Sequence, residues 1–196
     1  ALNGYAWYLL LVEGRAEEAL DFSERLLRVA PRDLYWRGER VSHFFFARQF
    51  ERALKEAKRV RLLDPDLLYW HEVWSYFWLA RFEEAYRAEI AYLQRCGAPC
   101  DRQRETLERG WAEGGWEGSW RAWLELMTRI EWFYPNAIAL IYTRIGETDM
   151  AFDWLERGYR ERDPHMMILK SQTAFDPLRS DPSYHDLLSR IGFRVE

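Results

Sequence analysis

No apolar run in the sequence is long enough to cross a bilayer. A transmembrane helix needs about 20 consecutive apolar residues, whereas the most apolar stretch, LLYWHEVWSYFWLARFEEA at 67–85, is interrupted by His71 and Glu72 and meets a charge again at Arg81. Residues 5–12 are apolar but lack the basic flank and the small-residue cleavage site of a signal peptide. The sequence therefore predicts no membrane insertion.

Cysteine is nearly absent, with only Cys96 and Cys100 in the chain. Two thiols without a neighbouring histidine cluster are too few for a four-ligand zinc site. Their spacing could place both on one helical face, but Gly97 and Pro99 oppose a helix between them. The sequence predicts two free thiols in a protein of the reducing cytoplasm, and no metal.

Lysine is also scarce, and the charge is close to balanced. The chain has 28 basic and 32 acidic residues, a net charge of −4, and lysine only at 55, 58 and 170. Because a phosphate-binding surface normally carries a basic excess, the composition does not predict a nucleic acid partner. Arg157 and Arg160 alternate with Glu156 and Glu161, as is typical of a solvated helical face. Binding of RNA or a phosphopeptide by such arginines is a minor alternative.

Motifs that carry catalysis are missing too. The four histidines are scattered, none lies in an HExxH pattern, and there is no glycine-rich phosphate loop. His71 and Glu72 are adjacent, so on a helix their side chains would point about 100° apart and could not act as a pair. Acidic pairs such as Glu83-Glu84 stand where helices are expected to begin, a position that the helix dipole favours for carboxylates. We expect no catalytic residue, no cofactor and no enzymatic activity.

What the sequence does contain is an internal repeat. Four stretches share an alanine near the start and a proline at the end, and they are 14–31, 48–65, 81–99 and 146–164. Their alanines are Ala19, Ala53, Ala85 and Ala151, at intervals of 34, 32 and 66 residues. The last interval is twice 33, which predicts a degenerate copy centred near Gly118, with its turn at Gly114-Gly115.

Each copy has the periodicity of two helices joined by a turn. A small residue lets the helices of a hairpin approach closely, alanine has the highest helix propensity, and proline ends a helix. In 16–30 the apolar stripe is Ala19, Leu20, Leu26, Leu27 and Val29. The sequence therefore predicts an all-α fold with about five helical hairpins in 1–164, the fourth being degenerate near 102–130.

Residues 165–196 are predicted to form a C-terminal cap. Asp176-Pro177 and Asp181-Pro182 each place an N-cap acceptor before a proline, so short helices are expected to begin there. The next helix should bury three apolar residues and expose four polar ones, which are Leu187, Leu188 and Ile191, and Ser183, His185, Asp186 and Arg190. A helical array needs such a polar-backed end.

The period and these residues resemble the tetratricopeptide repeat, a helix–turn–helix of 34 residues. The resemblance covers most of the chain. In the last copy it is carried by Ile138-Ala139, Tyr142, Gly146 and Leu155, and in the second copy by Val41, Phe44 and Ala57. The tryptophan of the family has no clean counterpart. The resemblance implies a right-handed α-α superhelix, a solenoid whose first helices line a concave groove.

A second resemblance concerns the C-terminal third. The segment that includes FDPLRSDP at 175–182 resembles the C-terminal repeat region of bacterial multidomain regulators. Those regulators place tetratricopeptide repeats after a protein kinase, a winged-helix DNA-binding domain or a nucleotide cyclase, and no motif of these effectors occurs in the 196 residues. The resemblance implies an interaction module of a cytoplasmic signalling or transcriptional regulator.

Aromatic residues are abundant, with 11 tryptophans in 196 residues. If Ala85 sets the register, residues 69–79 form the first helix of the third copy, and Tyr69, Val73 and Tyr76 face neighbouring helices. The residues predicted to line the groove are Trp70, Trp74, Phe77 and Trp78, together with Tyr8, Phe45 and Phe46 from the first two copies.

Two readings of these aromatic residues remain open. A ring at helical spacing most often belongs to the core between repeats. The number of rings favours a recognition surface, since rigid aromatic area suits binding hot spots. The sequence therefore predicts a non-catalytic groove that binds a peptide, a helix or a partner domain. Its alternatives are a sensor of a small apolar ligand and a self-association module that forms a homodimer.

Overall fold

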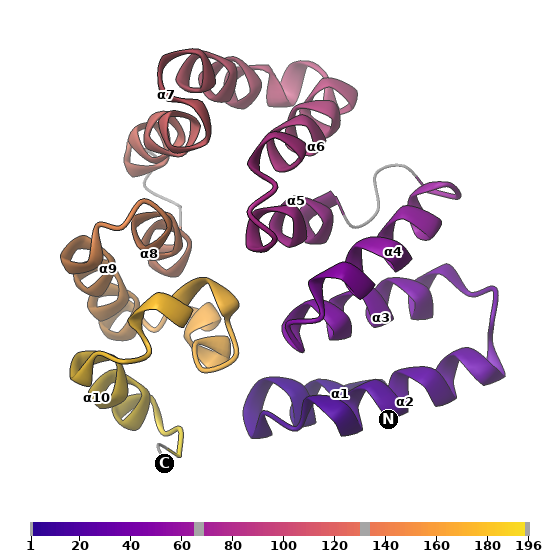
Figure 1. Ribbon diagram of the computed structural model, residues 1–196. Helices are drawn as coiled ribbons and strands as arrows, with labels where there is room; N and C mark the ends of the chain where they lie inside the picture. The colour runs from indigo at the N-terminus through magenta and orange to yellow at the C-terminus, as the bar shows by residue number, and fades with distance from the viewer. Residues whose placement is uncertain (1, 65–68, 130–133, 195–196) are drawn as a thin grey trace. The chain divides into compact units, whose positions relative to one another are not determined.

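The computed structural model describes residues 2–64, 69–129 and 134–194 (Figure 1). All regular elements within these ranges are helices, and none is a strand. The prediction of an all-α fold is confirmed. The chain divides into two compact units, Ala1–Arg104 and Glu105–Glu196. They are called unit 1 and unit 2 below, and each is described by itself.

Unit 1 consists of consecutive helical hairpins. Its elements are α1 (Leu2–Tyr8), a π-helical turn η1 (Leu9–Glu13), α2 (Ala16–Val29), α3 (Leu34–Phe46), α4 (Phe50–Arg61), α5 (Tyr69–Trp78), α6 (Phe82–Cys96) and a 3-10 turn η2 (Ala98–Cys100). Helices that follow each other in the chain pack together from α1 to α6, both within a hairpin and between hairpins. The first helix predicted for the third copy is therefore present, as α5.

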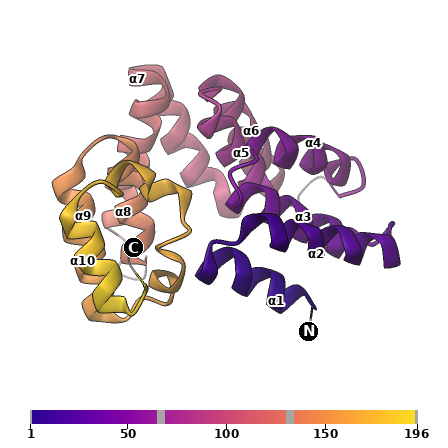
Figure 2. The ribbon, with the colours of Figure 1, turned by 60° about the horizontal axis from the view of Figure 1, so that its bottom comes forward.

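The helix α7 (Asp101–Thr128) carries the chain from unit 1 into unit 2. It is followed by α8 (Pro135–Arg144), α9 (Thr148–Glu161), the 3-10 segments η3 (Pro164–Ile168) and η4 (Thr173–Leu178), and α10 (Pro182–Ile191). Figure 2 shows α8, α9 and α10 side by side, and α9 packs against both of the others. The segment η4 packs against α8.

The same turn joins the helices of four hairpins. Each turn contains one residue with positive φ, which is 71° at Gly14, 60° at Arg48, 56° at Ala80 and 79° at Gly146. Each of these residues lies five positions before the alanine of its copy, so the period of the sequence is also a period of the backbone.

The hydrogen bonds of this turn also recur. The N–H of Gln49 donates to the carbonyl of Phe44 at 2.8 Å, and the same bond five residues back recurs in the third and last copies. In the first copy the π-helical turn adds a residue, and the N–H of Arg15 donates to the carbonyl of Leu9 at 2.8 Å. The turn therefore tolerates an extra residue in the first helix without losing its closing bond.

The alanines that set the period lie inside the hairpins. Ala19, Ala53, Ala85 and Ala151 are each 0% exposed. Five of the residues that carry the tetratricopeptide resemblance, Val41, Phe44, Ala57, Ile138 and Leu155, are buried as well. In the apolar stripe predicted for 16–30, the prediction is wrong for Val29, which is 86% exposed because it is the last residue of α2.

The degenerate copy is a close crossing of two helical segments within α7. The helix is interrupted at Gly114 and Gly115, where the backbone leaves helical values, as the predicted turn requires. A Cβ atom at Gly110 or at Gly118 would overlap the backbone oxygen of the other residue. Gly118 thus occupies the place of the alanine, and here even one methyl group is too large.

In the C-terminal segment, one of the two predicted helix starts is confirmed. Asp181 accepts a hydrogen bond from the N–H of Ser183 at 2.8 Å and caps α10, which buries Leu187 and Leu188 and exposes its polar face. The prediction for Asp176 is wrong. It lies inside η4, which begins at Thr173, and its carboxylate accepts from Arg179 Nε at 2.6 Å.

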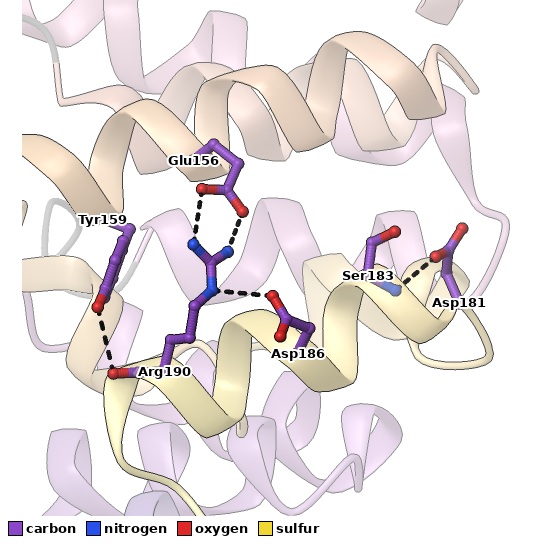
Figure 3. Close-up of polar contacts among 6 residues, drawn as sticks. All are labelled: Glu156, Tyr159, Asp181, Ser183, Asp186 and Arg190. Carbon is purple, nitrogen blue, oxygen red and sulfur yellow. Dashed lines mark hydrogen bonds and ion pairs between the residues drawn. The ribbon is translucent and has the colours of Figure 1, made fainter.

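Side-chain contacts hold α10 on α9 (Figure 3). The guanidinium of Arg190 bridges Glu156 on α9 and Asp186 on its own helix, the latter at 2.9 Å. The hydroxyl of Tyr159 donates to the carbonyl of Arg190 at 3.4 Å. The polar outer face of α10 therefore holds this helix on α9, while Leu187 and Leu188 pack into the interior.

Cys96 and Cys100 form a disulfide, so the prediction of two free thiols is wrong. Gly97, with φ 71° and ψ −147°, turns the chain at the end of α6 and brings the two Cα atoms within 5.8 Å, a distance that suits a disulfide.

None of the described helices has the length and apolar character that a membrane span requires.

Candidate functional site: an aromatic cluster in unit 1

Six aromatic rings of α3, α4 and α5 form a closed circuit in unit 1. The centroid distances are 5.6 Å for Phe45–Phe50, 5.9 Å for Phe50–Trp78, 5.4 Å for Trp78–Phe77, 5.7 Å for Phe77–Trp74, 5.8 Å for Trp74–Trp70 and 5.4 Å for Trp70–Phe45. These six rings are called the aromatic cluster. Most meet edge to face, the geometry that aromatic quadrupoles favour.

Two branches extend the aromatic cluster. Phe46 contacts Phe45 at 5.4 Å and Trp7 of α1 at 5.6 Å, and Phe82 of α6 contacts Phe77 at 5.5 Å. Contacts between rings therefore run through all three hairpins of unit 1. Because the rings stand on packed helices, their positions are set before any partner arrives.

The residues predicted to line a groove differ in exposure. Phe45 is 1% exposed and Trp74 is 5% exposed, so both support the cluster from within. Phe46, Trp70, Phe77 and Trp78 are half-buried and keep part of each ring at the surface. Both readings of the sequence are thus represented, core for two positions and surface for four.

Tyr8 is placed differently from the other six. It is 47% exposed, stacks against Tyr5 at 6.4 Å, and its hydroxyl donates to Glu13 at 2.6 Å. Val73 and Tyr76 are buried against neighbouring helices as predicted. The side chain of Tyr69 lies outside the described residues.

Three members of the network, Trp7, Phe50 and Phe82, are additional to the rings predicted from the sequence. The repeat would have identified two of them. Phe50 and Phe82 each lie three residues before the alanine of their copy, at the first position of α4 and α6. Trp7 is instead held by a hydrogen bond from its indole N–H to Glu39 at 2.6 Å, a contact that no period predicts.

Two histidines adjoin the aromatic rings, His43, which is buried, and His71, which is half-buried with its Nδ1 shielded from solvent. His43 contacts Trp7 edge to face at 4.7 Å, and its Nδ1 is hydrogen-bonded to the hydroxyl of Ser23. Burial lowers the pKa of His43 to about 4, while the carboxylate of Glu39 raises it. His71 contacts Phe45 at 5.6 Å, and burial lowers its pKa to about 4 as well. Both imidazoles are therefore neutral at pH 7.

The Ser23–His43 pair has the residue types of a nucleophile and its base. However, Ser23 is 3% exposed and His43 is 0% exposed, so no substrate reaches the hydroxyl. The pair joins α2 to α3 through the core instead. Its role is to satisfy two buried polar groups.

Two ion pairs join the helices that carry the aromatic cluster. Arg61 of α4 contacts Glu72 of α5 at 2.6 Å, and Arg37 of α3 contacts Glu56 of α4 at 2.8 Å. Both carboxylates are almost fully buried. Removing one partner would leave a buried charge, so Arg37–Glu56 fixes the two helices of one hairpin and Arg61–Glu72 fixes how that hairpin packs on the next.

Unit 2 contains a shallow hollow of about 340 Å³ between α7 and α8. It is lined by Arg121, Leu124, Glu125, Thr128, Tyr142, Ile145 and Glu147. Hydrogen bonds to Glu117 and Glu147 raise the pKa of Arg121, which remains charged. Among the described residues no group of three or more His, Cys, Asp or Glu side chains could hold a metal ion.

The aromatic cluster and Phe46 together present four half-buried rings on packed helices, and Glu56 and Glu72 beside them are paired with arginines. Comparisons of the chain with protein-family models, with curated proteins and with solved structures found no match.

Proposed function

We propose that the chain is a non-catalytic protein–protein interaction module in which the aromatic cluster of unit 1 binds an apolar peptide, a helix or a partner domain. The observation that carries the proposal is the half-buried state of Phe46, Trp70, Phe77 and Trp78, which contact the buried rings of Phe45 and Trp74 or lie next to them in the aromatic network. Such rings offer area to a partner while the core beneath holds them in place.

The energetics favour this use. Covering apolar area contributes roughly 25 cal/mol per Å², and rings already fixed on helices lose little conformational entropy on binding. Phe45 contacts Phe46 and Trp70, and Trp74 contacts Trp70 and Phe77. These two buried rings therefore keep the half-buried rings oriented. Charged side chains at the rim, such as Arg81 and Glu84, would supply specificity.

We further propose that the hairpins stack as a right-handed tetratricopeptide superhelix. Support comes from the period of about 33 residues, from the recurring turn with one positive φ, and from the buried small residue of each copy. The resemblance of 175–182 to the end of bacterial multidomain regulators supports a place in a cytoplasmic signalling or transcriptional regulator.

Selection from a phage-displayed library of random peptides tests the proposal. The wild-type chain is compared with Trp70→Ala plus Trp78→Ala, which removes two half-buried rings. The control is Trp36→Ala in the same unit, a half-buried ring stacked edge to face on Tyr35 at 4.8 Å and outside the aromatic cluster. We expect wild type and control to enrich the same apolar peptides and the double variant to lose them.

Circular dichroism establishes that all three proteins are folded. Enrichment of the same peptides by the double variant would contradict the proposal. Light scattering of the free protein separates the related possibility of self-association: a dimer that the double variant abolishes would show that a second copy is the partner.

A further inference from the structure

We propose that Cys96–Cys100 is a thiol-exchangeable disulfide in which an external thiol attacks Cys96 and Cys100 leaves as the thiolate. The bridge joins the last residue of α6 to the last residue of η2, immediately before α7. It is the one site in the described residues where a covalent bond can be exchanged without disrupting a hydrophobic core.

Access to the bridge supports the proposal. Both cysteines are half-buried, and the residues between and beside them, Ala98, Pro99 and Arg95, are exposed. A small thiol can therefore approach the sulfur atoms from solvent, as a nucleophile must for thiol–disulfide exchange. A bridge buried in a core would be inert to such attack.

The direction of attack follows from the helix ends. Cys96 lies at the C-terminus of the 15-residue α6, where the helix dipole disfavours a thiolate. Cys100 lies at the N-terminus of α7, which runs without interruption to Glu113, and there the dipole stabilises a thiolate. Since the sulfur with the lower pKa is the better leaving group, attack on Cys96 with loss of Cys100 is favoured.

Neighbouring charges do not reverse this order. Arg95 precedes Cys96 and donates to the carbonyl of Ala91 at 3.0 Å, while Arg102 follows Cys100 by two residues. Asp101, the first residue of α7, contacts Arg104 at 3.2 Å, so its charge is offset. Each cysteine therefore has one arginine within two residues along the chain, and the helix ends make the difference.

The exchange balances with a monothiol such as glutathione as reductant. Its thiolate attacks Sγ of Cys96, the S–S bond breaks, and Cys100 leaves as a thiolate that takes a proton from water. A second thiolate then attacks the mixed disulfide, releasing Cys96 as a thiol and glutathione disulfide. The protein disulfide gains two electrons, and two glutathione thiols are oxidised.

Reduction would loosen the connection between α6 and α7 without unfolding either helix. The hydrogen bonds from the N–H of Gly97 to Leu93 at 3.2 Å and from the N–H of Cys100 to Gly97 at 2.9 Å remain available. We expect faster amide hydrogen exchange at 97–100 after reduction, with the circular dichroism spectrum unchanged.

Three measurements on the full chain test the proposal. Thiol titration of the denatured, air-oxidised protein should find no free thiol before reduction and two after it. Limited glutathione, acid quenching and peptide mass mapping should place the adduct on Cys96. In the single variants, iodoacetamide at pH 7 should alkylate Cys100 of Cys96→Ser about three- to tenfold faster than Cys96 of Cys100→Ser.

The two serine variants are matched controls, because each retains one sulfur and the same loop. Two free thiols in the air-oxidised protein would overturn the proposal. So would an adduct on Cys100, or equal alkylation rates in the two variants. None of these outcomes bears on the aromatic cluster, so failure here and failure of the proposed interaction are distinguishable.

Discussion

In the second and third hairpins of unit 1, the residue seven positions before the buried alanine is aromatic, Phe46 or Trp78, whereas the last hairpin of unit 2 has Arg144 at this position. In these two hairpins of unit 1 the position contributes a half-buried ring to the aromatic network. In unit 2 the Nε and Nη1 atoms of Arg144 are shielded from solvent, and η4 of the same chain packs against α8.

The electrostatics of Arg144 show what that covering does. Burial lowers the pKa of its guanidinium well below the usual range, and the carboxylate of Asp176 in η4 raises it. The same position of the repeat therefore holds different residue types in the two units. In unit 2 it is a charged residue on a helix packed against η4, and it interacts with Asp176. In the second and third hairpins of unit 1 it is a half-buried aromatic ring.

The units also differ in how they hold histidine. Unit 1 holds the buried His43 and the half-buried His71 as neutral imidazoles beside aromatic rings, whereas His165 and His185 of unit 2 are exposed. Unit 1 also contains Glu89, whose pKa burial raises to about 7. Lowering the pH should therefore change the stability of unit 1 through His43, His71 and Glu89.

The largest loss of stability is expected at the close helix crossing, where unit 2 has Gly118 and unit 1 has an alanine, such as Ala85, at the corresponding position. Gly118→Ala in unit 2 places a methyl group against the backbone of Gly110, and we expect a loss of at least about 3 kcal/mol in the free energy of unfolding. Ala85→Gly at the corresponding place in unit 1 removes one buried methyl group and raises the backbone entropy of the unfolded chain, and should cost about 2 kcal/mol. Urea unfolding measures both.

Gly114→Ala is the control within the same helix, since a Cβ atom there has no neighbour within 4 Å. We expect it to be nearly neutral. If Gly118→Ala were as well tolerated as Gly114→Ala, the close crossing in α7 would be refuted.

The second effect is acid sensitivity of unit 1. The folded pKa of His43 and of His71 is about 4, below the ordinary 6.5, so the unfolded chain binds more protons between these values. Stability is complete above about pH 6.5 and is lost as the pH falls towards 4, by up to about 3 kcal/mol per histidine. Thermal unfolding followed from pH 7.5 to 4.5 measures the loss.

Glu89 opposes this trend and serves as the internal check. Its folded pKa of about 7 lies above the ordinary 4.5, so its stabilising contribution is complete below pH 4.5 and is lost as the pH rises through 7. Glu89→Gln should steepen the loss of stability in acid, and His71→Phe should reduce it. An unchanged pH dependence in both variants would refute the assignment of these groups.

The smallest effect concerns the shared turn. Gly14→Ala in unit 1 and Gly146→Ala in unit 2 force alanine to a φ above 70°, and each should cost about 1 kcal/mol. Ala80→Gly at the equivalent position should be neutral or stabilising by a few tenths of a kcal/mol, since a left-handed residue is replaced by glycine. Opposite signs for Gly14→Ala and Ala80→Gly in denaturant melts would verify that the turn is one motif.

The aromatic site could be predicted only in part. The register placed Val73 and Tyr76 correctly in the core, and it selected rings that do gather in one network. It did not separate Phe45 and Trp74, which are buried, from Trp70 and Trp78, which are half-buried. Exposure of a ring depends on which side chains lie across from it, and helical spacing does not encode that.

The local sequence by itself determined the helical hairpins, the spacing of about 33 residues and the buried alanine, whereas the left-handed residue of the turn, Arg48 or Ala80 in two copies, could not be identified from its type. These are constraints on a few consecutive residues or on one backbone crossing, and they repeat along the chain. Only the tertiary structure decided the closed circuit of rings, the Ser23–His43 contact and the covering of α8 by η4. It also revealed the bond between Cys96 and Cys100, because Gly97 turns the chain after α6 and brings the two cysteines together.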